Sequence, residues 1–213
     1  MARRKINEIR YAEQSISLRD AFNLAKVSLS NSIAIGPRAT ALEEQLMNLT
    51  NSGYCTSFSS GTAGLHAAYN SIPNIRESEV ITSPLSFIAT ASTALFCGAS
   101  IKFVDIDINT GLMDIAKVDS AISRKTSVVT VVDYAGIPFD VPSLRMKLKD
   151  QVEYIIQDAA HSFGSKINNE YIGNLADMTV FSSFPTKNIA AGEAGAVTSN
   201  NIDLYNKFNK FKW

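Results

Sequence analysis

Short apolar runs that stop at a polar residue constrain the fold of this chain most strongly. Tyr154–Asp158 ends in a carboxylate, and Ser127–Asp133 is almost continuously apolar up to its own aspartate. Runs this short and this rich in β-branched residues are typical of strands buried on both faces of a parallel sheet. Helical segments follow them, so strand and helix alternate along the chain. We therefore predict an α/β fold: a mainly parallel sheet with helices on both faces, forming an α/β/α sandwich.

The expected elements divide the chain into an N-terminal helical segment, residues 1–35, and one larger domain, residues 36–213. A helix is expected over 15–32, and Pro37 is placed in the first turn of the next helix, where a missing N–H costs least. Leu42, Leu46 and Leu49 give that second helix an apolar stripe. Further strands are expected at 54–58, 79–83, 101–107, 127–133, 154–158 and around 180, and further helices at 65–69, 88–96, 115–122, 141–149 and beyond 199.

Composition excludes several classes of function. The 213 residues are 46% hydrophobic and 19% charged, with a formal net charge of zero, so no broad basic surface indicates nucleic acid or an anionic membrane. No apolar segment approaches the ~20 residues that span a bilayer. The basic residues 1–5 precede no apolar stretch, so no signal peptide is expected there. Cys55 and Cys97 are expected to be buried reduced thiols, which favours a cytoplasmic protein.

Two strand ends carry complementary charges. Asp158 closes one buried run, and Lys187 follows a second run, Val180–Ser182, by a few residues. Ligands of open α/β sheets bind at the carboxyl ends of the strands. A carboxylate and a lysine at this edge suit a cofactor that needs a protonated ring nitrogen at one end and covalent attachment at the other, which is pyridoxal phosphate. Lys187 taken alone would instead be interpreted as a solvated surface lysine.

A small-residue turn and an aromatic residue complete this candidate site. Ser59–Gly64 lies between a strand and a helix, and the N–H groups at such a helix start bind phosphate readily. A tight turn that only caps the helix remains the alternative. Phe87 lies at the start of another helix, where its ring either joins the core or stacks on a planar cofactor.

Asp105 and Asp107 raise the question of a metal site. They lie near the turn Asn109–Gly111, and no third ligand is in view. Carboxylates in this position commonly accept hydrogen bonds from turn amides. We expect capping of the turn and no metal.

With these residues placed, the chain resembles the DegT/StrS family, the pyridoxal-phosphate-dependent sugar aminotransferases of fold type I. The likeness extends from about Gly36 to Asn200. Its motifs occur in the family's order: Ile35-Gly36-Pro37, Ser60-Gly61-Thr62-Ala63, Ile81-Thr82-Ser83-Pro84-Leu85-Ser86-Phe87, Val104-Asp105-Ile106-Asp107, Asp158-Ala159-Ala160-His161, and Phe181-Ser182-Ser183-Phe184-Pro185-Thr186-Lys187-Asn188.

The resemblance implies a role for each matching residue. Lys187 matches the lysine that binds the cofactor and later moves the substrate proton, and Asp158 matches the partner of the ring nitrogen. His161 takes the position beside the 3-hydroxyl group, where a purely structural histidine is the alternative. The remaining matches are Gly61, Thr62, the Ala63 backbone and Ser182 at the phosphate, and Phe87 stacked on the ring.

The family also implies substrates and partners. They are a nucleotide-linked keto sugar and glutamate, and a homodimer that shares its active sites. The Ser83–Phe87 stretch resembles members that make 4-amino-4,6-dideoxy sugars of the pseudaminic acid type. Phe184 replaces the family's usual histidine, Ala194 replaces a common glycine, and the smaller C-terminal domain is expected to be missing.

Two alternatives stay open at this point. Some relatives are sugar dehydratases in which a histidine replaces the lysine, and Lys187 argues against that chemistry. The other is a fragment that keeps the fold and acts only as a binding or structural module.

Overall fold

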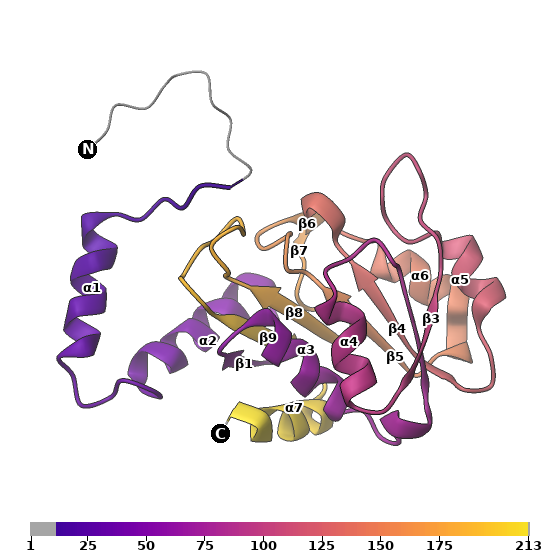
Figure 1. Cartoon of the computed structure of the whole chain (residues 1–213), viewed down its shortest axis with the longest axis horizontal. Helices are drawn as coiled ribbons and strands as arrows, with labels where there is room; N and C mark the ends of the chain where they lie inside the picture. Colours follow the sequence, from indigo (N-terminus) through magenta and orange to yellow (C-terminus); the bar gives the residue numbers. More distant parts are fainter. Residues whose placement is uncertain (1–11, 213) are drawn as a thin grey trace.

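The structure, a computed structural model, describes residues 12–212, so the basic residues 1–5 lie outside it. A seven-stranded sheet in the order β1-β9-β8-β5-β4-β2-β3 forms its centre (Figure 1). β9 pairs antiparallel with β1 and β8, and the other neighbouring strands are parallel. The strands are β1 (Tyr54–Phe58), β2 (Glu79–Thr82), β3 (Ser100–Phe103), β4 (Thr126–Val132), β5 (Tyr154–Asp158), β8 (Met178–Ser182) and β9 (Gly195–Ser199), with β6 (Lys166–Ile167) and β7 (Glu170–Tyr171) forming a separate hairpin.

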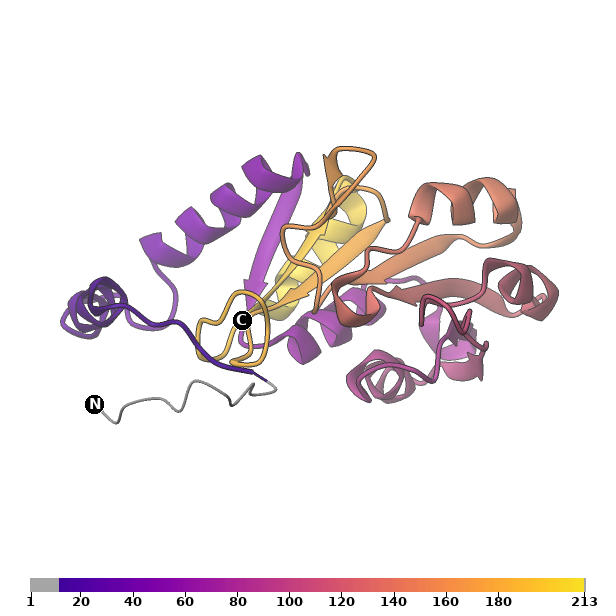
Figure 2. The same cartoon turned by 90° about the horizontal axis from the view of Figure 1, so that it is seen from above.

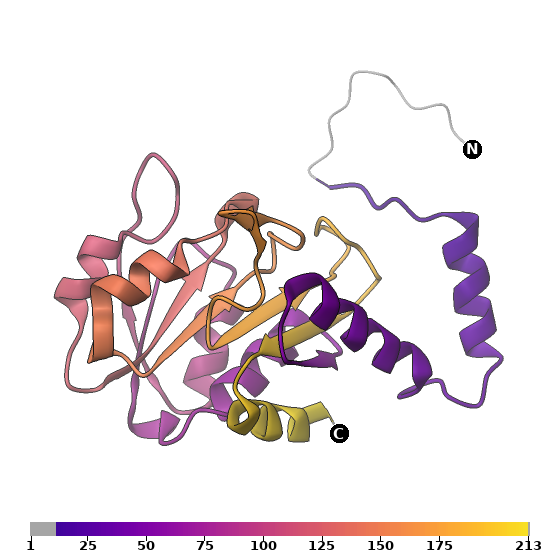
Figure 3. The ribbon, with the colours of Figure 1, turned by 180° about the vertical axis from the view of Figure 1, so that it is seen from behind.

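Helices cover both faces of this sheet, which confirms the predicted α/β/α arrangement (Figure 2). One face packs against α3 (Gly61–Asn70), α4 (Ala89–Phe96) and α7 (Ile202–Phe208). The other packs against α2 (Pro37–Thr50), α5 (Ile115–Ala121) and α6 (Val141–Leu148); α2 and α6 lie in front of the strands in Figure 3.

Alternation along the central strands explains why both faces are apolar. Ile155 packs into the cluster under α5 and α6, whereas its neighbour Ile156 packs into the cluster under α3 and α4. Successive side chains of a strand point to opposite faces, so a continuous apolar run fills two cores at once. This is the pattern on which the sequence prediction rested.

Most predicted elements occur within a residue or two of their expected positions. The strand predicted over 101–107 is wrong beyond Phe103, because the chain there turns: the Asn109 amide donates to the Asp107 carboxylate at 2.7 Å. The stripe on α2 is partly wrong as well, since Leu46 is buried but Leu42 is 41% exposed. Strand β9 and the β6–β7 hairpin were not predicted.

The N-terminal helix α1 (Leu18–Ser28) is shorter than the predicted 15–32 and buries none of its residues. Ser17 and Asp20 close its first turn as a capping box. Figure 1 shows α1 beside the α/β body and away from the sheet. Within residues 12–212 no helix is both long and apolar enough to cross a bilayer. Cys55 and Cys97 are free and buried, as expected.

A close backbone contact joins the first residue of β9 to the start of α3. A Cβ built on Gly195 would lie 2.3 Å from the carbonyl carbon of Ser60 and 2.5 Å from the Gly61 nitrogen. Backbone atoms cannot give way as a flexible side chain does, so only glycine fits here. Gly195 thus fixes the distance between the sheet and the α3 start.

We predict that Gly195→Ala lowers the free energy of unfolding by about 2–3 kcal/mol, because the added methyl overpacks this contact. Urea denaturation measures the loss. Gly53→Ala is the matched control: its Cβ would meet its nearest atom at an ordinary 3.5 Å. The control should stay within about 0.5 kcal/mol of the unmodified chain. Equal losses of unfolding free energy in Gly195→Ala and Gly53→Ala would contradict the close contact of Gly195 with the α3 start.

Candidate active site

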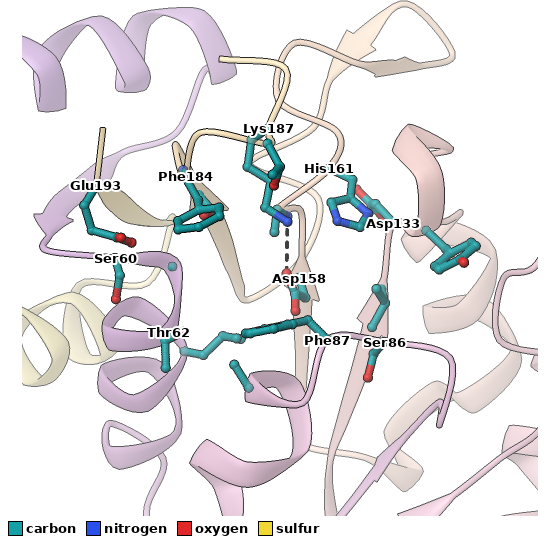
Figure 4. A pocket seen from close by; sticks show the side chains of 18 of the residues that line it. Ser60, Thr62, Ser86, Phe87, Asp133, Asp158, His161, Phe184, Lys187 and Glu193 are labelled. Carbon is teal, nitrogen blue, oxygen red and sulfur yellow. Dashed lines mark hydrogen bonds between the residues drawn. The ribbon is translucent and has the colours of Figure 1, made fainter. Parts of the chain in front are cut away.

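A cavity of about 730 Å³ opens at the carboxyl edge of the parallel strands (Figure 4). Its walls come from the β1–α3 turn, the segment before α4, the ends of β4 and β5, and the loop between β8 and β9. All but one of the predicted site residues line it, namely Gly61, Thr62, Phe87, Asp158, His161, Ser182 and Lys187. Ala63 is the exception: its amide donates to the Ser60 hydroxyl at 3.1 Å as part of the helix cap.

Asp158 ends β5 and is 5% exposed. Its Oδ2 accepts a hydrogen bond from the Thr90 hydroxyl at 2.7 Å, and its Oδ1 accepts one from the Ala160 amide at 3.2 Å. Burial raises the pKa of Asp158, and these two bonds and the charges of Lys187 and His161 oppose that rise. The carboxylate is therefore held rigidly and is suited to a cationic partner in the cavity.

Lys187 lies in the loop between β8 and β9. Its amide donates to the Phe184 carbonyl at 2.9 Å, closing a turn that carries the side chain over the strand ends. In Figure 4 the side chains of Lys187 and Asp158 point toward one another within the cavity. Burial lowers the pKa of Lys187, which the charge of Asp158 partly opposes. Lys187 is half-buried and lines the cavity, so it is not a fully solvated surface lysine.

The β1–α3 turn presents a helix start to the cavity. The Ser60 hydroxyl caps α3, while the first amides of the helix, those of Gly61 and Thr62, lie outside its internal hydrogen-bond ladder. A Cβ on Gly61 would approach the Ser182 Cβ to 2.8 Å, so Ser182 lies against this helix start. Amides, hydroxyls and the positive end of the helix dipole together suit an anion such as phosphate.

Phe87 and His161 lie on different walls of the cavity. Phe87 is 66% exposed, so it is not a core residue, and Figure 4 shows it below Asp158. His161 is half-buried, and its ring centroid lies 6.4 Å from that of Tyr134. Burial, followed by the nearby charge of Lys187, lowers the pKa of His161.

Several lining residues were not predicted as part of the site. Those with polar or aromatic side chains include Ser86, Asp133, Tyr134, Phe184, Thr186 and Glu193. Asp133 had a usable signal, because it ends the apolar run of β4 just as Asp158 ends β5. Parallel neighbours bring both ends to one edge. The remaining residues lie in loops or, for Tyr134, in a single 3-10 turn, where no periodicity marks them.

The acidic pair outside the cavity has a structural role. Asp107 accepts the Asn109 amide, and Asp105 pairs with Lys117 at 3.2 Å. Within the described part of the chain, no group of three His, Cys, Asp or Glu residues could hold a metal ion. The predicted capping of the turn is thus seen in the hydrogen bonds themselves.

The sheet order, the buried carboxylate, the lysine facing it and the adjoining helix start define a class: the pyridoxal-phosphate-dependent transferases of fold type I. The family is narrower. A sequence profile described as the DegT/DnrJ/EryC1/StrS aminotransferase family matches residues 15–213. The chain belongs to this family.

Individual relatives agree with that assignment. The UDP-4-amino-4,6-dideoxy-N-acetyl-beta-L-altrosamine transaminase of Campylobacter jejuni is 33% identical over 202 residues, which are 93% of this chain and 53% of that protein. Helicobacter pylori PseC, described as an aminotransferase involved in pseudoaminic acid biosynthesis, superposes with a TM-score of 0.89 at 30% identity, covering 95% of this chain and 55% of that one.

A third relative bears on the cofactor. The putative sugar aminotransferase Spr1654 of Streptococcus pneumoniae, solved in its PLP form, has a TM-score of 0.85 and 27% identity over 94% of this chain and 56% of that one. The chain spans about half the length of the curated relatives it matches.

The Asp158–Lys187 electrostatic interaction can be tested in the protein without cofactor. Asp158 raises the pKa of Lys187, so Asp158→Asn is expected to lower that pKa further below the ordinary lysine value. Reductive methylation with ¹³C-formaldehyde followed by an NMR pH titration measures it, and Lys187→Arg identifies the signal. A Lys187 pKa that stays the same or rises in Asp158→Asn would contradict the shared cavity.

Proposed function

We propose that this chain carries the cofactor site of a pyridoxal-phosphate-dependent aminotransferase that transfers an amino group from glutamate to a nucleotide-linked keto sugar. One observation carries the proposal: Asp158 and Lys187 face one cavity, with the α3 start beside them. Membership of an aminotransferase family and the sugar transaminases among its relatives support it.

The residues present suit pyridoxal phosphate at each of its functional groups. Asp158, fixed by Thr90 and Ala160, would hold the protonated ring nitrogen. Gly61, Thr62 and Ser182 would hold the phosphate at the α3 start, with the Ala63 backbone adding to the field of the helix dipole. Phe87 would lie against the ring, and His161 would lie beside the 3-hydroxyl group.

The chemistry then divides between cofactor and protein. When bound, pyridoxal phosphate withdraws electrons from the substrate carbon that loses its proton. Lys187 would anchor the cofactor and, once released by the amino donor, would take that proton as a general base. Its lowered pKa favours the neutral amine that this step requires.

Wider features of the enzyme are part of the same proposal. The sugar would be of the pseudaminic acid type, as in the biosynthesis in which Helicobacter pylori PseC is involved, and the product would serve surface-glycan synthesis. We further propose a cofactor-binding large domain over residues 36–213 after a helical segment over 1–35, a homodimer with shared active sites, and a cytoplasmic location, which the two free buried thiols favour.

Lys187→Ala is expected to reduce transamination by about 10³-fold or more, because it removes both the anchor and the base. Coupled glutamate turnover with a UDP-linked 4-keto sugar measures the rate, and mass spectrometry after borohydride reduction shows whether cofactor mass stays on the chain. Lys166→Ala is the matched control: Lys166 is an exposed lysine that lies over the Tyr171 ring, outside the cavity.

Each result has a defined meaning for the alternatives. Normal turnover in Lys187→Ala would refute the lysine assignment. A product that has lost water and gained no nitrogen would support the dehydratase chemistry. A native chain that takes up no pyridoxal phosphate in a spectroscopic titration would support the non-catalytic fragment.

A further inference from the structure

A second buried carboxylate lies at the cavity, and the proposed chemistry does not use it. Asp133 follows β4, is fully buried, and donates its amide to the Asp158 carbonyl at 3.0 Å. Its side chain accepts hydrogen bonds from the Phe139 amide at 2.8 Å, from the Gln157 amide group at 3.0 and 3.1 Å, and from the Ser162 hydroxyl. A carboxylate with this many protein donors has little acceptor capacity left for a ligand.

One of these donors leads directly to the cavity. Ser162 closes the turn Ala159–Ser162, because its amide donates to the Ala159 carbonyl at 3.1 Å. His161 is the third residue of that turn. The first half of the turn is held by Asp158 through the Ala160 amide, and its last residue is held by Asp133 through the Ser162 hydroxyl. Asp158 and Asp133 therefore hydrogen-bond to the turn on either side of His161.

The segment after Asp133 supports the same turn. A Cβ on Gly136, whose φ is +86°, would lie 3.2 Å from the His161 carbonyl, and the Ser165 hydroxyl donates to the Gly136 carbonyl at 3.2 Å. The Tyr134 ring faces the His161 ring across the same corner. Backbone contacts this close leave the turn little room to shift while the Ser162–Asp133 hydrogen bond is in place.

We propose that Asp133 is a positioning residue: through Ser162 it locks the Ala159–Ser162 turn and so holds the His161 imidazole in the cavity wall beside Lys187. The lock involves only residues of this chain and needs no bound group. Its consequence for the 3-hydroxyl group of the cofactor rests on the proposed function. Without the lock, His161 would sample solvent and would no longer present one fixed nitrogen to the cavity.

The charges and the burial around the turn determine in which direction the pKa of His161 should change when the turn is released. Asp133 and Asp158 face it from the strand ends, and Lys187 faces it from the β8–β9 loop. Burial raises the pKa of Asp133 to about 6, and the bonds from Ser162, Phe139 and Gln157 oppose that rise. Burial is also the main cause of the lowered pKa of His161. Releasing the turn should therefore raise the pKa of His161 toward its ordinary value.

The chain offers a direct readout because it contains two histidines, His66 and His161. In the cofactor-free protein, an NMR pH titration of the two ring signals follows each separately. Ser162→Ala breaks the lock and keeps the Asp133 charge, so the pKa of His161 is expected to rise. The neutral-form ring signal of His161 should also move toward its solvent-exposed position, as the Tyr134 ring no longer shields it. Asp133→Ala, which removes the acceptor of the Ser162 hydroxyl, should produce the same change in the neutral-form signal.

Asp177→Asn is the matched control. Asp177 is another hydrogen-bonded carboxylate, accepting the Ile155 amide at 2.7 Å and pairing with Arg145 at 2.9 Å, but it directly precedes β8 and so lies at the opposite, amino edge of the sheet. The Asp177→Asn substitution should lower the unfolding temperature and leave the pKa and the ring signal of His161 unchanged. A folded Ser162→Ala variant with an unshifted His161 would overturn the proposal, and so would an equal shift in Asp177→Asn. Because no cofactor is involved, either result is independent of whether the chain transaminates.

Discussion

The register of β5 against its two neighbours is the constraint on which the cavity depends. Val132 of β4, Asp158 of β5 and Val180 of β8 lie side by side in the sheet. Everything that leaves these strands at their carboxyl ends therefore leaves at one edge: Asp133, the His161 turn and the loop that carries Lys187. A shift by one residue would turn Asp158 to the opposite face of the sheet and separate it from the lysine. In this register the apolar side chains on the two faces pack into two separate clusters, one under α3 and α4 and one under α5 and α6.

Hydrogen bonds at the carboxyl edge of the sheet fix the orientation of the two acidic side chains that the register brings together. Asp158 reaches across to α4 through Thr90, and the Tyr69 hydroxyl in turn donates to the Thr90 carbonyl at 2.8 Å. Asp133 reaches across to Ser162. Asp158 is thus bonded to α4, and Asp133 to the turn that contains Ser162. The two acids are neighbours in the sheet but have different hydrogen-bond partners. One remains directed at the cavity, and the other is committed to the protein.

The sequence predicted the parts of this arrangement that follow from periodicity. The apolar runs at 54–58 and 154–158 were placed at their observed bounds, and the pairing of a strand-end acid with Lys187 followed from them. Features that depend on tertiary contact could not be predicted. Gly195–Ser199 contains two small residues and two hydroxyls, and it becomes a strand because β1 and β8 leave a gap of one strand between them.

The reversed direction of β9 has a mechanical consequence for the lysine. Ser182 at the end of β8 pairs with Gly195 at the start of β9, so the segment between them leaves and re-enters the sheet at a single rung. A hydrogen bond from the Ser183 amide to the Ala194 carbonyl at 2.8 Å extends that rung outward by one step. The loop that carries Lys187 is consequently closed at its base by hydrogen bonds between its two ends. The amine of Lys187 can therefore change position by rotation of its own side chain, while the strands beneath the loop stay in place.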